Sequence, residues 1–200
     1  MQVAISDWFP TPIWTVKVDN HESLNADLIP KIYALRDSNK SGVYLSNIHG
    51  WQSELSMQLM AEFEPLNRQI LGALSQIARF LKYHPQSQIV LQAWANINKK
   101  GAYNLVHNHP NCHLSGAYYV QTPENSGGIF FDDPRVQACM CLPPSEGKTP
   151  YAHNKVRLAP EAGKMYVFPA WLEHGVEPNE SDEDRITVGF NAVAKMTRKG

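Results

Sequence analysis

Three histidines are the side chains of this sequence with the clearest chemical potential. His107 and His109 stand two residues apart, and His174 follows an apolar run that ends in Phe-Pro-Ala-Trp. Residues two apart on a β-strand leave the same face, so we expect the first two imidazoles to point the same way. If His174 joins them from a second strand, the three rings form a facial metal site with open positions. Non-haem iron uses this arrangement for oxygen chemistry.

Arg185 adds a second chemical group downstream of these histidines. Its guanidinium is permanently charged and carries a rigid fork of donors, so it can hold a carboxylate through two hydrogen bonds. An acidic cosubstrate would then bind the metal at one end and Arg185 at the other. The competing interpretation is a surface ion pair between Arg185 and Asp182 or Asp184.

Other candidate ligands have weaker support. His113 shares strand parity with His107 and His109, but Pro110 is expected to break a strand between them, so the choice between His109 and His113 as third ligand stays open. The chain also contains three cysteines, Cys112, Cys139 and Cys141. They lack the second Cys or His pair of a zinc ribbon and suggest no disulfide framework, which indicates a reducing compartment.

Composition narrows the class of protein. The 200 residues include 18 basic and 19 acidic side chains and 43% apolar residues, which predicts a single domain with a sizeable core. A net charge near zero gives no electrostatic reason to expect a nucleic-acid partner. Apolar runs fall short of the roughly 20 residues of a membrane span, and the first residues do not resemble a signal peptide. We therefore expect a cytoplasmic protein without a membrane partner, and a homodimer stays open.

The residues before the histidines must supply the elements that support them. Alternating polarity predicts a strand, apolar residues at helical spacing predict two helical stretches, and a polar, glycine-containing segment predicts a loop. Asn25 is the expected cap of the first helix, and Pro65 either kinks the second stretch or begins a new helix there. The expected elements are a strand over 11–18, a helix over 25–39, a loop over 41–53 and helical structure over 57–83.

The following half of the chain has the pattern of short strands separated by turns. Strands are expected over 88–98, 114–121, 128–132, 164–168 and 185–194, and a long loop over 136–157. Such a series favours a sandwich or jelly roll over a parallel sheet, and helices that precede strands are expected to brace one face. The predicted fold class is mainly β with flanking helices: residues 1–85 form an N-terminal strand and supporting helices, and residues 86–195 a double-stranded β-helix, the cupin-like jelly roll.

Several motifs occur in a fixed order across this half. They are His-Asn-His-Pro at 107–110, Leu-Ser-Gly-Ala-Tyr-Tyr-Val at 114–120, Gly-Gly-Ile-Phe-Phe-Asp-Asp-Pro-Arg at 127–135, Phe-Pro-Ala-Trp-Leu-Glu-His-Gly-Val at 168–176 and Arg-Ile-Thr-Val-Gly-Phe-Asn at 185–191. The series resembles the iron(II)- and 2-oxoglutarate-dependent dioxygenases, above all the prolyl-hydroxylase-like branch and a group of its small bacterial and phage members. The resemblance covers residues 89–194.

The resemblance implies a ligand set for iron(II) made of His107, His109 and His174. The sequence departs from the family at one ligand, because the general pattern is His-x-Asp and the Asp position holds His109. Three neutral imidazoles leave the site with the full double charge of the metal, which should strengthen its hold on a dianionic cosubstrate. The departure puts the ligand set and the activity in question more than the fold.

The resemblance also implies a pocket for 2-oxoglutarate. Its far carboxylate would meet Arg185 and the hydroxyl of Tyr119, with Tyr118 as the weaker choice, and Thr187 shares a strand face with Arg185. The implied reaction is hydroxylation of an unknown substrate by O2, with decarboxylation of 2-oxoglutarate to succinate.

Two other functions stay open on the residues alone. One is a three-histidine cupin-type metalloenzyme that does not use 2-oxoglutarate, and the other is a non-catalytic jelly-roll binding module. Arg185 discriminates between the 2-oxoglutarate enzyme and the cupin-type metalloenzyme, because only the 2-oxoglutarate enzyme requires it.

Overall fold

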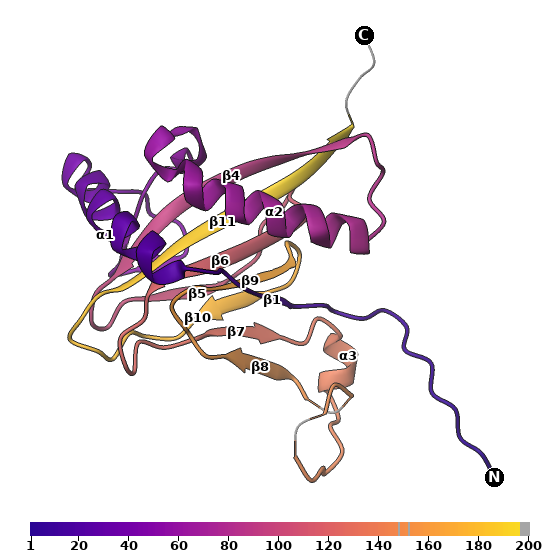
Figure 1. The fold of residues 1–200 in the computed structure, drawn as a ribbon. Helices are drawn as coiled ribbons and strands as arrows, with labels where there is room; N and C mark the ends of the chain where they lie inside the picture. The colour runs from indigo at the N-terminus through magenta and orange to yellow at the C-terminus, as the bar shows by residue number, and fades with distance from the viewer. Residues whose placement is uncertain (148, 152, 197–200) are drawn as a thin grey trace.

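Two antiparallel sheets form the β core of the computed structural model, which describes residues 1–147, 149–151 and 153–196 (Figure 1). The larger sheet has the order β1 (Trp14–Lys17), β9 (Lys164–Pro169), β6 (Leu114–Gln121), β11 (Arg185–Met196), β4 (Ser87–Asn98) and β3 (Trp51–Gln52). The smaller sheet has the order β2 (Asn47–Ile48), β5 (Tyr103–His107), β10 (His174–Val176), β7 (Ile129–Asp132) and β8 (Lys155–Leu158). The expected mainly-β, double-stranded β-helix class is confirmed.

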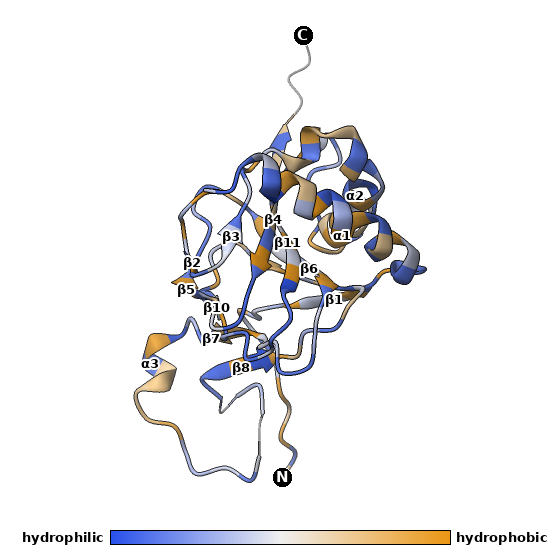
Figure 2. Ribbon diagram, turned by 90° about the vertical axis from the view of Figure 1, so that its left-hand side faces the viewer, coloured by the Kyte–Doolittle hydropathy of each residue, from blue (hydrophilic) through white to orange (hydrophobic). Residues whose placement is uncertain are grey.

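Two helices, α1 (His21–Ser38) and α2 (Glu64–Phe80), cover the outer face of the larger sheet (Figure 1). Their apolar side chains, including Leu28, Ile32 and Leu74, are fully buried against residues of β4, β6 and β11. Figure 2 shows apolar and polar residues alternating along both helices, as expected where one side of a helix is buried. The helices therefore brace the sheet from the face opposite the smaller sheet. No helix of the described residues is long and apolar enough to cross a membrane.

The first helix begins before the expected cap. The strand expected over 11–18 is present but shorter, as β1, and α1 starts at His21. Asn25 therefore lies inside the helix, and the prediction that it caps the helix is wrong. Its buried Nδ2 donates to the carbonyl of Val120 at 2.8 Å and its Oδ1 accepts from the hydroxyl of Tyr118 at 2.6 Å. The amide thus satisfies polar groups of β6 instead of a helix end.

Proline decides how the second helical stretch is divided. Two short 3-10 turns, Met57–Leu59 and Ala61–Phe63, precede α2, and Pro65 stands in its first turn. This is the position where a proline loses no intrahelical hydrogen bond. Of the two predictions, a new helix rather than a kink is confirmed.

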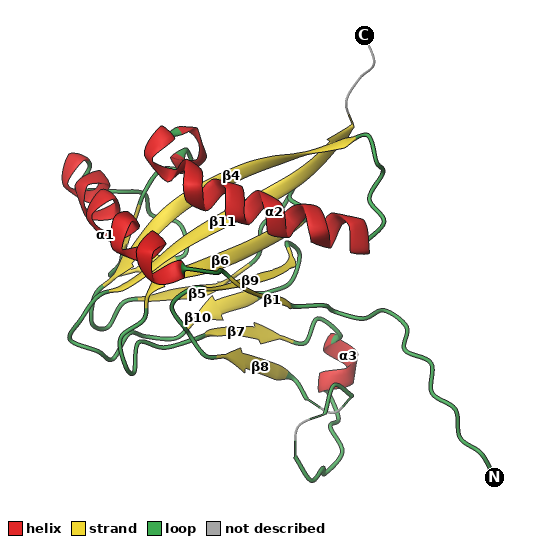
Figure 3. Ribbon diagram, in the orientation of Figure 1, coloured by secondary structure: helices red, strands yellow, loops and turns green. Residues whose placement is uncertain are grey.

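The strands expected after residue 86 are present with nearly the expected ends, but shorter elements were missed (Figure 3). Strands β2 and β3 lie in the segment expected to be a loop over 41–53. Strands were expected to carry the histidines, but no bounds were predicted for β5 and β10. The loop expected over 136–157 contains a short helix, α3 (Val136–Cys139), and the first residues of β8. Residues 148 and 152 of that loop lie outside the described residues. The missed strands are short and gain their hydrogen bonds from partners distant in the sequence.

Candidate metal centre

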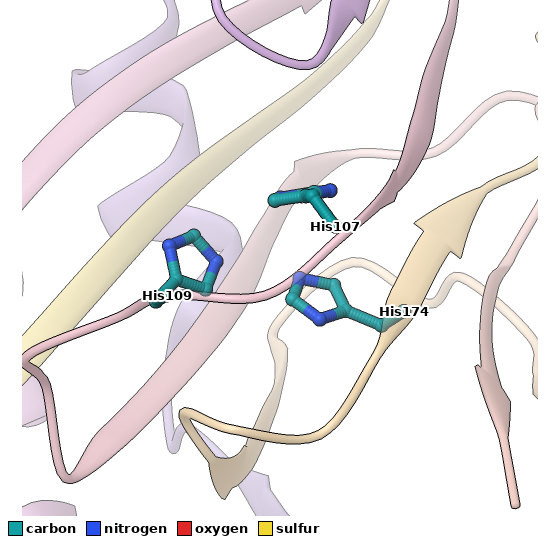
Figure 4. Close-up of side chains that lie close together, drawn as sticks. All are labelled: His107, His109 and His174. Atoms are coloured by element: carbon teal, nitrogen blue, oxygen red, sulfur yellow. The ribbon is translucent and has the colours of Figure 1, made fainter. Parts of the chain in front are cut away.

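The three histidines come together where strands β5 and β10 of the smaller sheet pair. His174 begins β10 and is the Cα partner of His107, the last residue of β5. The atoms that each residue can offer to a metal all lie within 4.8 Å of one another. Figure 4 shows the three rings pointing toward one another. Their centroids are 4.4 to 5.2 Å apart. One ion can thus be shared by all three.

His109 reaches this cluster by a route that the sequence did not predict. It lies beyond the end of β5, so the expectation that His107 and His109 share a strand face is wrong. The backbone N–H of His109 donates to the carbonyl of Ala170 at 2.8 Å, and its ring stands 5.8 Å from that of Trp94. These contacts, rather than strand parity, place the imidazole.

The tautomers of two histidines fit a metal. Nδ1 of His107 lies 2.8 Å from the carbonyl oxygen of Leu105, and Nδ1 of His174 lies 2.9 Å from that of Leu172. A carbonyl oxygen can only accept, so both Nδ1 atoms carry the proton. Nε2 of each ring therefore carries a lone pair that a metal can use, and a hydrogen bond from Nδ1 to a carbonyl is the usual outer contact of a metal-binding histidine. At His107 this nitrogen also lies 3.4 Å from the hydroxyl of Ser46, a long contact that a metal would replace.

Burial keeps the cluster neutral. It lowers the pKa of His174 to about 3 and that of His109 to about 4, and it also lowers the pKa of His107. Mutual repulsion adds to burial at His174 and His109. Metals bind neutral imidazoles, so the cluster does not have to release protons at neutral pH before it binds an ion.

The other candidate ligands lie elsewhere. Nδ1 of His113 accepts the backbone N–H of Ala194 at 3.1 Å, and its ring packs edge-on against Tyr83. Of the two alternatives for the third ligand, the structure brings His109 and not His113 to the cluster. The three cysteines are free thiols, and within the described part of the chain they belong to no group that could hold a metal.

Arg185 is a buried cation rather than a surface one. It is 1% exposed, and its Nη1 donates to the carbonyls of Ser126, Gly127 and Glu177. Burial lowers its pKa to about 10, which still leaves it charged at neutral pH. The two acidic residues considered as surface partners of Arg185 bind other groups: Asp182 pairs with Lys100, and Asp184 accepts a hydrogen bond from the hydroxyl of Tyr33. The second guanidinium nitrogen, Nη2, is buried and has no hydrogen-bond partner among the described residues.

An unpaired donor on a buried cation is costly unless an anion meets it. The arrangement therefore fits a carboxylate. Burial raises the pKa of the Tyr119 hydroxyl, and the positive charge of Arg185 acts against this rise, so the two groups interact electrostatically. Tyr118 points to the helices, where it bonds Asn25, and is excluded as the contact. Thr187, the Cα partner of Tyr119, stands two residues from Arg185.

A cavity of about 460 Å³ adjoins the histidine cluster. It lies within the range of about 300–1,000 Å³ that is usual for ligand pockets. The three histidines and Thr187 line it, whereas Arg185 and Tyr119 are not among its lining residues. On β11 the cavity thus reaches Thr187, which is two residues from Arg185.

Sequence reasoning missed a group of amides around this cavity. Gln52, Asn96 and Asn191 are buried polar residues of the larger sheet and line the cavity. Asn191 has the strand parity of Thr187, and a polar residue of that parity on a buried strand is the signal that could have found it.

Comparison with known families decides the class of the protein. Residues 92–191 match the family described as "putative 2OG-Fe(II) oxygenase". The chain belongs to this family. Membership in this oxygenase family brings iron(II) as the metal, 2-oxoglutarate as the cosubstrate and O2 as the oxidant, which confirms the resemblance drawn from the motifs. Among curated proteins, none matches the sequence significantly.

Solved structures share the fold of this oxygenase at low sequence identity. A prolyl-4-hydroxylase from Pseudomonas putida has a TM-score of 0.60 and 13% identity, covering 92% of both chains. The α-ketoglutarate-dependent carbocyclase SnoK of nogalamycin biosynthesis has a TM-score of 0.65 and 13% identity over 91% of this chain and 79% of its own. A prolyl hydroxylase from Trichoplax adhaerens, in complex with a hypoxia-inducible-factor peptide, has a TM-score of 0.62 and 12% identity over 90% of this chain and 82% of its own. At such identities the likeness shows the fold alone.

Proposed function

We propose that this oxygenase hydroxylates an organic substrate, with iron(II) held by His107, His109 and His174. The observation that carries the proposal is the pairing of a neutral, inward-facing histidine cluster with a buried cation that has an unused donor. Iron(II) with 2-oxoglutarate and O2 supplies the oxidising power to functionalise a C–H bond. The protein's residues bind, orient and shield the reactants.

Each side chain has a role that its environment supports. Nη2 of Arg185, with the hydroxyl of Tyr119 and Thr187, binds the far carboxylate of 2-oxoglutarate. Phe168, which is 1% exposed and packs against His174 at 4.5 Å between ring centroids, keeps water from the inner side of the cluster. A dry, low-dielectric wall strengthens the pairing of the guanidinium with an anion.

Hydroxylation is the finer part of the proposal. The solved structures of the same fold include enzymes named as hydroxylases and others named as an epimerase and a carbocyclase. The fold therefore does not select the outcome of the oxidation. Hydroxylation is the outcome we propose, and product analysis decides it.

A second candidate is a three-histidine metalloenzyme that does not use 2-oxoglutarate. The observation in its favour is His109, which stands where the general family pattern has an aspartate. A non-catalytic jelly-roll module would need neither Arg185 nor an open metal position.

Uncoupled turnover separates these functions. Protein loaded with iron(II) is incubated with 2-oxoglutarate and ascorbate in air, and succinate is followed by NMR spectroscopy. We expect slow succinate formation by the parent protein and background formation by His174→Ala, which lacks a ligand. Metal-loaded parent protein that forms succinate no faster than this variant, and does not bind 2-oxoglutarate, would contradict the proposal.

A further inference from the structure

Two carboxamides stand side by side on the wall of the metal-site cavity. Gln52 of β3 and Asn96 of β4 are Cα partners in an antiparallel pair, so their side chains leave the same face of the sheet. Both line the cavity that contains the histidines. On the other side of Asn96, its partner across β11 is Thr187. The pair thus adjoins the place proposed for 2-oxoglutarate.

Each of these amides has an unused hydrogen-bonding atom. Gln52 is 3% exposed and Asn96 8%, yet Nε2 of Gln52 and Oδ1 of Asn96 are buried and without a partner among the described residues. A buried polar atom without a partner costs free energy comparable to a lost hydrogen bond. Nε2 of Gln52 is a donor and Oδ1 of Asn96 is an acceptor, so together they can bind a ligand group that both accepts and donates hydrogen bonds.

The rest of the cavity lining indicates the charge of that group. The described residues that line the cavity include no Lys, Arg, Asp or Glu. A charged group of the substrate would lose its hydration there without gaining a counter-ion from a side chain, and the double charge of the metal is already matched by the dianionic cosubstrate. The mouth is apolar, with the half-exposed side chains Leu45, Leu55, Leu105 and Val106. A ligand with an uncharged polar group on an apolar body matches both the uncharged polar wall and the apolar mouth of the cavity.

We propose that Gln52 and Asn96 bind an uncharged amide group of the substrate, with Nε2 of Gln52 donating to its carbonyl and Oδ1 of Asn96 accepting from its N–H. This inference rests on the proposed function, because it places the substrate beside the metal and the cosubstrate. The apolar mouth holds the part of the substrate that carries the amide.

Benzamide and benzoate form a matched probe pair, since they share shape and apolar body and differ in charge. Isotope-labelled protein loaded with zinc(II) and 2-oxoglutarate is titrated with each, and the side-chain amide resonances of Gln52 and Asn96 are followed by NMR spectroscopy. The variants Gln52→Leu and Asn96→Leu assign these resonances. We expect both to shift with benzamide, and benzamide to bind about tenfold or more tightly than benzoate.

Three outcomes would overturn the inference. The first is equal or tighter binding of benzoate, and the second is no shift of either resonance, which would mean that the amide group of the probe does not contact the pair. The third is weaker binding of 2-oxoglutarate to Gln52→Leu, which would assign the pair to the cosubstrate. Gln92→Leu is the matched control, because Gln92 lies on β4 with Asn96 but is exposed and does not line the cavity. If zinc-loaded parent protein does not bind 2-oxoglutarate, the proposed function fails, and the probes are still compared in the zinc-loaded protein.

An independent observation concerns Asn191 and His109. Nδ2 of Asn191 lies 3.3 Å from Nδ1 of His109, and its Oδ1 is buried without a partner in the described part of the chain. In this orientation the ring accepts at Nδ1, so the proton of the neutral imidazole sits on Nε2. Figure 4 shows that nitrogen directed toward the other two histidines, where a metal needs a free lone pair.

Rotating the side-chain amide of Asn191 by half a turn exchanges its Oδ1 and Nδ2. This removes both conflicts, the unpaired Oδ1 of Asn191 and the proton on Nε2 of His109. Oδ1 of Asn191 then accepts from Nδ1–H of His109, and Nε2 becomes free for the metal. His107 and His174 already donate from Nδ1 to backbone carbonyls. We infer that Asn191 is a positioning residue that holds His109 in the tautomer of the other two ligands.

Tautomer and metal affinity test this role without turnover. Asn191→Leu removes the acceptor, whereas Asn191→Asp keeps one. We expect the ring-nitrogen NMR signals of metal-free protein to show the Nδ1–H form of His109 in the parent and in Asn191→Asp, but not in Asn191→Leu. Cobalt(II) affinity, followed by absorption, should fall about 10- to 100-fold in Asn191→Leu and be restored in Asn191→Asp. Gln92→Leu, at the Cα partner of Asn191 on β4, is the control. Parental tautomer and affinity in Asn191→Leu, or no rescue by Asn191→Asp, would refute the inference.

Discussion

Replacing Arg185 with alanine is expected to weaken the binding of 2-oxoglutarate while metal binding stays intact. The guanidinium is 1% exposed, and Nη2 has no partner in the described residues, so an arriving carboxylate meets a charge that water does not screen. Removing one member of a buried charge pair costs about 2–5 kcal/mol. At about 1.4 kcal/mol for each factor of ten, this loss corresponds to roughly 30- to 4,000-fold in affinity.

The same residue also supports the fold, so the assay must separate the two roles. Nη1 donates to the carbonyls of Ser126, Gly127 and Glu177, and alanine leaves all three without this donor. Calorimetric titrations therefore compare 2-oxoglutarate with 2-oxobutyrate, which has the same 2-oxo acid group but no far carboxylate. Manganese(II) replaces iron. Parent protein and Arg185→Ala are titrated with both acids.

The pairing predicts a loss specific to one ligand. Arg185→Ala should weaken 2-oxoglutarate by the factor above and change 2-oxobutyrate little, with manganese affinity near that of the parent. Arg185→Lys should recover only part of the loss, because lysine lacks the planar fork of donors. Equal losses for the two acids would assign the effect to local unfolding. Unchanged affinity for 2-oxoglutarate would refute the reasoning and favour the three-histidine enzyme that does not use it.

Three further substitutions probe the site and its support. His174→Ala should abolish cobalt(II) binding by removing one of three ligands, and parental cobalt(II) absorption in this variant would rule out the proposed ligand set. Tyr118→Phe leaves the buried Oδ1 of Asn25 without its donor and should lower the free energy of unfolding by about 1–3 kcal/mol in urea titrations, with metal affinity unchanged; a loss of metal affinity would contradict the placement of Tyr118 on the helix side. Gly189→Ala would place a Cβ 2.5 Å from the ring of Trp94, so we expect a loss of about 1–3 kcal/mol from overpacking, and unaltered thermal unfolding would contradict that close approach.

Local patterns in the sequence were sufficient for the long strands and for the presence of the first helix, but not for the residue at which that helix begins. The strands expected over 114–121 and 185–194 agree with β6 and β11 almost to the residue, because alternation over many positions and flanking turns are local signals. The outcome at Asn25 was not local. Whether this amide caps a helix or bonds β6 depends on how the helix packs against a sheet assembled from residues far along the chain.

The sequence by itself determined the family, through ordered motifs, and brought His107, His109 and His174 forward as one set. Only the tertiary structure decided how they meet. Strands β5 and β10 are too short to be recognised by periodicity, and they form by pairing with each other and with β2 and β7, which brings His174 opposite His107. The same holds for the buried amides of the cavity, since the register between β3 and β4 alone places Gln52 beside Asn96. Register depends on contacts between distant segments, and no local pattern encodes it.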